Sequence, residues 1–156
     1  MIIWKNNLTP HFSAAEYFPQ YREQNAYLTE ESYLFARILE ETRVDVGLRF
    51  YVNSWYRTQA QNKAVGGISS SNHLRGCAAD IHTKNKITRK RFVKIVLAFK
   101  KYCRKHGRVG EAGLYENFIH LGIQSETQKA VNGGKFIQWD ERTGERIYNN
   151  ILEVQD

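Results

Sequence analysis

The sequence predicts an α+β fold in a single domain, residues 1–156, with helices packed on a small and mostly antiparallel sheet. A chain of 156 residues is close to the usual size of one domain. Hydrophobic residues make up 42% and aromatic residues 13% of it, which is enough for a packed core. Helical patterns come mainly before a series of short strands, and this order favours α+β over a regular alternation of strands and helices.

Capping residues and apolar spacing place the elements of the first half. Ser13-Ala14-Ala15-Glu16 is typical of a capping box that opens a short helix. Thr29 is expected to cap a helix to about Val46, which Gly47 ends. Phe50 to Trp55 then predicts a strand, and Thr58 to Val65 predicts a short helix.

The second half is expected to begin with a short strand at Ala78–His82, followed by a helix from Thr88 to His106 that Gly107 closes. Apolar residues recur along this helix at helical spacing, at Phe92, Ile95, Val96, Phe99 and Cys103. Short strands are expected around Leu114, His120 and Gln138. The stretch 140–144 predicts a hairpin turn that joins 136–139 to 145–148.

The most informative segment runs from Ser71 to Asp80, with the sequence SNHLRGCAAD. It places His73 and Asp80 seven residues apart, and Gly76 between them allows a turn at little steric cost. A strand from residue 78 would then place Asp80 on the same face as its alternate neighbours. A second strand at 118–121 could present His120 beside Asp80.

Two imidazoles and one carboxylate can hold a zinc ion and leave one position for water. We therefore predict that His73, Asp80 and His120 bind Zn²⁺ in a hydrolytic enzyme. A His–Asp pair at this spacing is often structural, and a histidine in an apolar strand is often a core residue. The full S-x-H-x-x-G-x-A-x-D pattern is much rarer, on the order of once in ten thousand random chains of this length, and favours the metal site.

Several ordered motifs make the chain resemble the zinc D-alanyl-D-alanine metallopeptidases, and within them the small cell-wall peptidases common in bacteriophages and bacteria. The resemblance implies a hedgehog/D-Ala-D-Ala-peptidase-like fold and one zinc on His73, Asp80 and His120. It also implies an endolysin-like activity on peptidoglycan stem peptides, as a D,D- or L,D-carboxypeptidase or endopeptidase. The motifs are 12–18, 54–58, 62–67, 71–80, 113–115 and 118–120.

The resemblance assigns Arg57 to a carboxylate of the substrate. Stem peptides carry free carboxylates, and a guanidinium can bind one through two parallel hydrogen bonds. A structural salt bridge is the alternative for Arg57.

The general base is where the sequence departs from the family pattern. Relatives commonly carry an acidic residue three positions before the last histidine, and some carry an aspartate two positions after it, but here these positions are Asn117 and Gly122. The nearest carboxylates are Glu116 and Glu111, and we expect Glu116 to be the base because residues 116 and 120 share a face in an ideal strand. If no carboxylate reaches the site, the chain is instead a non-catalytic peptidoglycan-binding or virion structural protein that keeps the fold.

The charge is uneven. The net charge is +7, and residues 84–108 hold eleven Lys or Arg and no acidic residue. This basic face from Lys84 to Arg108 is either a solvated helix surface or a contact for anionic wall polymers. Nucleic acid is disfavoured, because Phe92 and Phe99 belong to the buried stripe and cannot stack on bases.

The sequence predicts no membrane span and no signal peptide, since Met1–Asn7 lacks a long apolar core. We therefore expect synthesis in the cytoplasm, with action at the bacterial cell wall after release or as part of a virion. Cys77 and Cys103 are the only cysteines and are expected to stay reduced.

Overall fold

The computed structural model describes residues 7–18 and 28–148. The prediction of no signal peptide was based on residues 1–7, and residues 1–6 lie outside the described residues. Within the described ranges the chain forms five α-helices, one short 3₁₀ helix and one five-stranded sheet. The predicted α+β class is confirmed.

Four helices lie where their caps predict them: α1 (Ala14–Tyr17), α2 (Glu30–Val46), α3 (Gln59–Ala64) and α4 (Arg89–Lys105). Their N-cap side chains are those of Ser13, Thr29, Thr58 and Thr88, and each accepts a hydrogen bond from a backbone N–H of the first turn. Gly47 ends α2 in the left-handed conformation, with φ of 66°. The sequence prediction missed α5 (Glu126–Val131), although Ser125 and Gln128 form a capping box there.

The sheet contains β1 (Tyr51–Ser54), β2 (Ala78–His82), β3 (Gly110–Leu114), β4 (Ile119–Ile123) and β5 (Ile137–Asp140). The strand order is β1-β2-β4-β3-β5, and only the β3–β5 pair is parallel. The hairpin predicted across 140–144 is reduced to one antiparallel bridge between Asp140 and Ile147. The sequence pattern could not show that β5 would pair with β3, which lies far from it along the chain.

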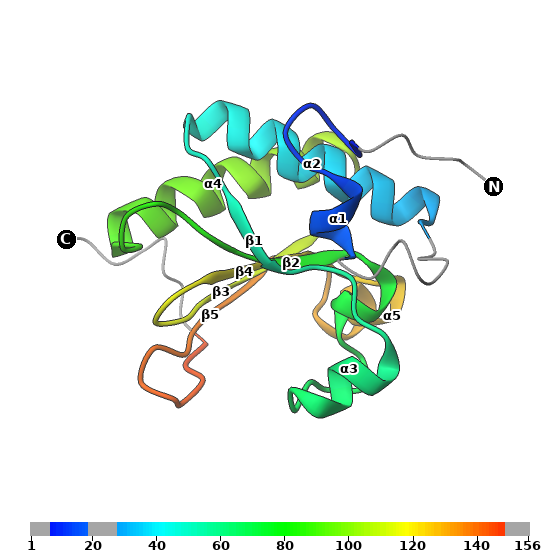
Figure 1. Ribbon diagram of the computed structural model, residues 1–156. Helices are drawn as coiled ribbons and strands as arrows, with labels where there is room; N and C mark the ends of the chain where they lie inside the picture. The colour runs from blue at the N-terminus through cyan, green and yellow to red at the C-terminus, as the bar shows by residue number, and fades with distance from the viewer. Residues whose placement is uncertain (1–6, 19–27, 149–156) are drawn as a thin grey trace.

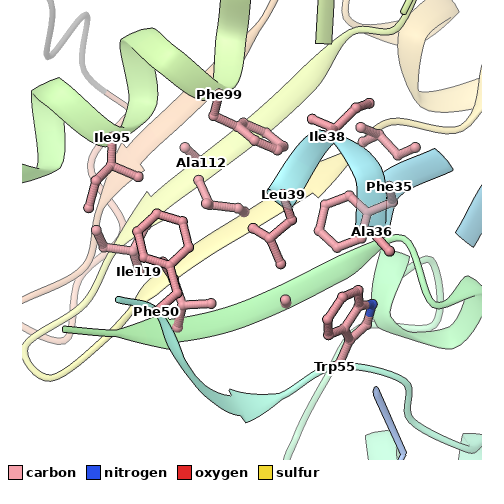
Figure 2. Packing of buried hydrophobic residues seen from close by; sticks show 14 of the residues in the cluster. Phe35, Ala36, Ile38, Leu39, Phe50, Trp55, Ile95, Phe99, Ala112 and Ile119 are labelled. Carbon is pink, nitrogen blue, oxygen red and sulfur yellow. The ribbon is translucent and has the colours of Figure 1, made fainter. Parts of the chain in front are cut away.

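Helices α2 and α4 cover one face of the sheet, and α3 and α5 lie on the opposite side (Figure 1). The predicted stripe of α4 is buried in one core cluster with residues of α2, such as Phe35 and Leu39, with residues of the strands, and with Trp55, which follows β1 (Figure 2). Ile119 and Leu121 belong to this core. Because side chains alternate along a strand, His120 points to the other face, away from α2 and α4.

Acidic residues of α2 neutralise part of the basic face. The Nζ atoms of Lys101 and Lys105 lie 3.1 Å and 2.5 Å from carboxylate oxygens of Asp45 and Glu41. Farther along, Arg108 makes a two-point contact with Glu31, with Nε–Oε1 of 2.6 Å and Nη2–Oε2 of 2.9 Å. The end of the basic run nearest Arg108 therefore helps to hold α4 and the following turn against α2.

The Glu31–Arg108 pair predicts a dependence of stability on acid. The hydrogen bonds from Arg108 lower the pKa of Glu31. A lowered carboxyl pKa in the folded state stabilises the fold above the unfolded pKa, and this contribution is lost as the pH falls through the folded pKa. Since the pair is partly exposed, we expect it to contribute about 0.5–1 kcal/mol.

Urea unfolding of the wild type and Glu31→Gln measures this contribution. The variant is expected to be less stable at neutral pH, and the difference should shrink as the pH falls below the ordinary pKa of a glutamate and through the lowered folded pKa of Glu31. A difference that stays constant as the pH is lowered would contradict the assignment.

Candidate metal centre

Three side chains that are distant in sequence meet on the face of the sheet away from α2 and α4. His73 comes from the 3₁₀ helix at Asn72–Arg75, Asp80 from β2 and His120 from β4. All three are buried, and one potential ligand atom from each lies within 4.8 Å of the others. Asp80 and His120 are direct partners in the β2–β4 register, so the sheet itself places them together.

The chain holds His73 in one orientation. The backbone carbonyl of Trp55 accepts a hydrogen bond from His73 Nδ1 at 2.6 Å, and His73 Nε2 lies 3.2 Å from Asp80 Oδ1. A carbonyl can only accept, so the proton is on Nδ1 and the lone pair of neutral His73 is on Nε2. The Trp55 indole also donates to the carbonyl of Gly76 at 3.0 Å, which links the strand end to the loop that carries His73.

Gly76 explains why this loop can form. It ends the 3₁₀ helix with φ of 67°, and a Cβ at this position would lie 2.1 Å from the hydroxyl oxygen of Tyr17. Backbone conformation and space therefore both require glycine here. The turn predicted at Gly76 is confirmed, and it brings Asp80 back toward His73.

Arg57 contacts Asp80. Its Nη2 donates to Asp80 Oδ2 at 2.7 Å, while its Nε donates to the hydroxyl of Ser54 at 2.9 Å. The other oxygen of Asp80, Oδ1, faces both histidines at 3.2 Å and 3.0 Å. Arg57 therefore fixes the rotation of the Asp80 carboxylate and leaves Oδ1 directed toward the two histidines. Its assignment to a substrate carboxylate stays a prediction.

A fourth side chain completes the cluster. Glu111 of β3 places Oε1 2.9 Å from His120 Nε2, and the same oxygen accepts a hydrogen bond from Asn72 Nδ2 at 2.8 Å. His120 Nδ1 lies 3.0 Å from Asp80 Oδ1. His120 thus lies between two carboxylates, with Nδ1 toward Asp80 and Nε2 toward Glu111.

The pKa values of the cluster follow from burial and these contacts. Burial lowers the pKa of His73, and its contact with Asp80 offsets this only in part. Burial acts against the charged form of His120 too, but the hydrogen bonds to Asp80 and Glu111 raise its pKa to about 9. Although burial favours protonation of the two carboxyls, contacts with the histidines hold the pKa of Asp80 and of Glu111 below their ordinary values.

The donor set fits a divalent cation. Metal ligands have to be deprotonated carboxylates or neutral imidazoles, and Asp80 and His73 already have these forms at neutral pH. Through Nδ1, His120 would become the third ligand on losing its proton, and its Nε2–H would donate to Glu111. A carboxylate behind a ligating histidine is a usual arrangement in zinc sites.

The position of Glu111 depends on Gly122. The two residues are partners across the β3–β4 pair. A Cβ on Gly122 would lie 2.8 Å from Glu111 Oε1 and 3.2 Å from the Cβ of Ala78. Glu111 therefore occupies the space above Gly122. Two signals in the sequence could have pointed to it: an acidic residue inside a short apolar strand, and the missing side chain two positions after His120.

The structure does not bring Glu116 to the cluster. Tyr115 N donates to the carbonyl of Phe118 at 3.0 Å, which closes a turn with Glu116 and Asn117 at its exposed tip. Strand β4 begins only at Ile119, so the expectation that residues 116 and 120 share a strand face does not apply. The assignment of Glu116 as general base stays a prediction, and Glu111 is the carboxylate that contacts His120 in addition to Asp80.

The cluster lines a cavity of about 870 Å³. One side of the cavity comes from the end of α3 and the loop that follows it, from Val65 to Asn72. The other side comes from β5 and the segment after it, including Trp139 and Arg146. The volume is large enough for a substrate of several residues.

A buried His–Asp–His group in a cavity of a small α+β domain defines a candidate metal-dependent hydrolase. Residues 10–122 match the family described as peptidase M15, and this region contains His73, Asp80, Glu111 and His120. The chain belongs to the peptidase M15 family, whose members are zinc peptidases. No curated protein and no solved structure matches it.

Proposed function

We propose that this chain is a zinc-dependent hydrolase of peptide bonds in peptidoglycan stem peptides. The observation that carries the proposal is the buried His73–Asp80–His120 group in a substrate-sized cavity, within the part of the chain that matches the peptidase family. The resemblance of the ordered motifs to cell-wall peptidases supports the substrate class.

In the proposed site His73 Nε2, Asp80 Oδ1 and His120 Nδ1 hold the metal. A bound zinc supplies a Lewis acid that polarises the peptide carbonyl and lowers the pKa of its water toward neutrality. The Trp55 carbonyl orients His73 through Nδ1, and Arg57 orients Asp80 through Oδ2. These contacts fix the ligands before substrate binds, which reduces the reorganisation that the reaction needs.

We propose Glu111, rather than Glu116, as the general base. It is half-buried, and against the effect of burial its contacts with the histidines lower its pKa and so favour the ionised form, and it contacts the cluster directly. Oε1 of Glu111 accepts from His120 and Asn72, so we assign the proton transfer to its second oxygen, Oε2: this oxygen would take the proton of the attacking water and pass it to the leaving amine. Its hydrogen bond from Asn72 holds the carboxylate in place during both transfers.

A second candidate is a non-catalytic wall-binding or virion protein that keeps the fold. The observation that favours it is the absence of an acidic side chain at both usual positions, Asn117 and Gly122. The basic face from Lys84 to Arg108 would suit anionic wall polymers in either case, although Lys101, Lys105 and Arg108 already pair with α2. In the described part of the chain, no helix has the length and apolar character to cross a bilayer.

Digestion of defined muropeptides, paired with a measurement of bound metal, tests the proposal. We expect about one zinc per chain and release of new amino groups from the stem peptide, and mass spectrometry of the products identifies the bond. Chelation should abolish release, and added Zn²⁺ should restore it. One bound zinc without cleavage of any stem peptide would contradict the enzyme and favour the wall-binding candidate.

A further inference from the structure

One wall of the cavity is built by a segment outside the family match. The match ends at residue 122, yet Trp139, Glu141, Arg146 and Tyr148 line the same cavity as the metal cluster. This wall is attached to the sheet through β5, which runs parallel to β3. The features of the cavity that this segment determines therefore lie outside the matched region.

Trp139 brings the wall against the cluster. Its ring centroid lies 5.5 Å from that of His120. The close approach needs a glycine at Gly113 of β3, which pairs with Trp139 of β5. A Cβ on Gly113 would lie 2.4 Å from the indole. The Trp139 indole therefore packs directly against the backbone of β3 at Gly113, beside the candidate metal ligand His120.

Arg146 also contacts this indole. Its guanidinium carbon is 4.7 Å from the Trp139 ring centroid, a cation–π distance. Nε donates to Glu141 Oε2 at 2.9 Å, Nη2 donates to the Tyr115 hydroxyl at 3.2 Å, and Tyr148 also bonds to the side chain. These contacts hold the guanidinium at the cavity wall, and a guanidinium carries more N–H donors than they use.

The two arginines that line the cavity differ in availability. Arg57 is engaged with Asp80, a candidate metal ligand, and its side chain is 17% exposed. The side chain of Arg146 is 38% exposed and its acidic partner, Glu141, is not a candidate ligand. A substrate carboxylate that bound Arg57 would compete with Asp80, whereas one that bound Arg146 would leave the cluster intact.

We propose that Arg146, supported by Trp139, binds a carboxylate of the peptide substrate and selects for acidic over amidated peptides. This inference rests on the proposed function for the identity of the ligand, a stem peptide with free carboxylates. Arg57 then acts as a positioning residue for Asp80. Charge-assisted pairing of a guanidinium with a carboxylate is the source of the selectivity.

The test uses the zinc-loaded protein, a stem pentapeptide, and two variants of it with the C-terminal or the glutamyl α-carboxyl converted to carboxamide. Isothermal titration calorimetry gives Kd, and initial rates give kcat/KM. The wild type is expected to bind the acid at least about 10-fold more tightly than one of the amides. Arg146→Gln should remove that preference by weakening the binding of the acidic peptide alone. Arg146→Lys should keep part of the preference.

Arg142→Gln is the matched control, since Arg142 lies in the same turn segment and pairs with Asp140 but does not line the cavity. It should keep the preference of the wild type. If Arg146→Gln only disturbed the cavity wall, it would weaken the binding of the acidic and the amidated peptides equally. This outcome would overturn the proposal. A wild type that binds all three peptides equally, or binds none, would overturn it too.

The calorimetric result separates this inference from the proposed function. Acid-selective binding that depends on Arg146 but comes without cleavage would refute the enzyme and uphold the subsite. Cleavage without any preference for the acidic peptide would uphold the enzyme and refute the subsite. If Arg57→Gln removes the preference and Arg146→Gln retains it, the carboxylate contact belongs to Arg57 instead.

Discussion

Glu111→Gln is expected to lower kcat by about 10²–10⁴-fold while the protein still binds one zinc. The substitution removes the proton acceptor but keeps the size of the side chain and an oxygen that can accept from His120 or Asn72. KM should change little, because the lost interaction belongs to the transition state. Steady-state kinetics on a muropeptide and metal analysis of the same sample measure both quantities.

Glu116→Gln is the matched control, because it makes the same chemical change in the exposed turn of the same hairpin. Its kcat should stay within about two-fold of the wild type, since Glu116 does not line the cavity. The reverse pattern, a severe loss in Glu116→Gln and none in Glu111→Gln, would show that Glu116 is the base and that the turn closes over the site.

A rescue experiment separates a base from a merely structural partner of His120. The double variant Glu111→Ala/Gly122→Asp moves the carboxylate to the partner strand, into the space that Glu111 now fills. We expect the kcat of this double variant to be at least about 10-fold higher than that of Glu111→Ala. Recovery of folding stability without recovery of kcat would assign Glu111 a structural role only.

His73→Ala is expected to abolish hydrolysis and to reduce zinc affinity by at least about 100-fold. Loss of an outer partner of a ligand already costs about 10–100-fold in affinity, and loss of a ligand should cost more. Two ligands would remain, Asp80 and His120, which is fewer than the three protein ligands of catalytic zinc sites. Competition with a fluorescent zinc chelator measures the affinity.

The control for this prediction is His82→Ala, which removes a histidine two positions after Asp80 that bonds to Asn53 instead of the cluster. It should bind zinc and cleave as the wild type does. Circular dichroism must show that His73→Ala keeps its fold, because the side chain is buried. Full zinc affinity in a folded His73→Ala protein would exclude His73 as a ligand.

The sequence predicted most of the helices because their signals are local. A threonine or serine cap followed by an apolar stripe states where a helix begins and which face is buried, and α2 and α4 follow these signals to within a residue or two. A strand was predicted around Gln138, where β5 lies, but no local signal identified the strand it pairs with. Its partner, β3, lies more than twenty residues earlier in the chain, with β4 and α5 between them.

The sequence alone determined the chemistry available to this protein: the His73, Asp80 and His120 side chains, the glycine that lets their loop turn, and a core large enough for one domain. Tertiary structure alone decided which carboxylate joins them. Glu111 reaches His120 because β3 and β4 pair in a register that places it over Gly122, while a turn directs Glu116 to solvent. Register between strands depends on packing across the whole sheet, so no local pattern around either glutamate could specify it.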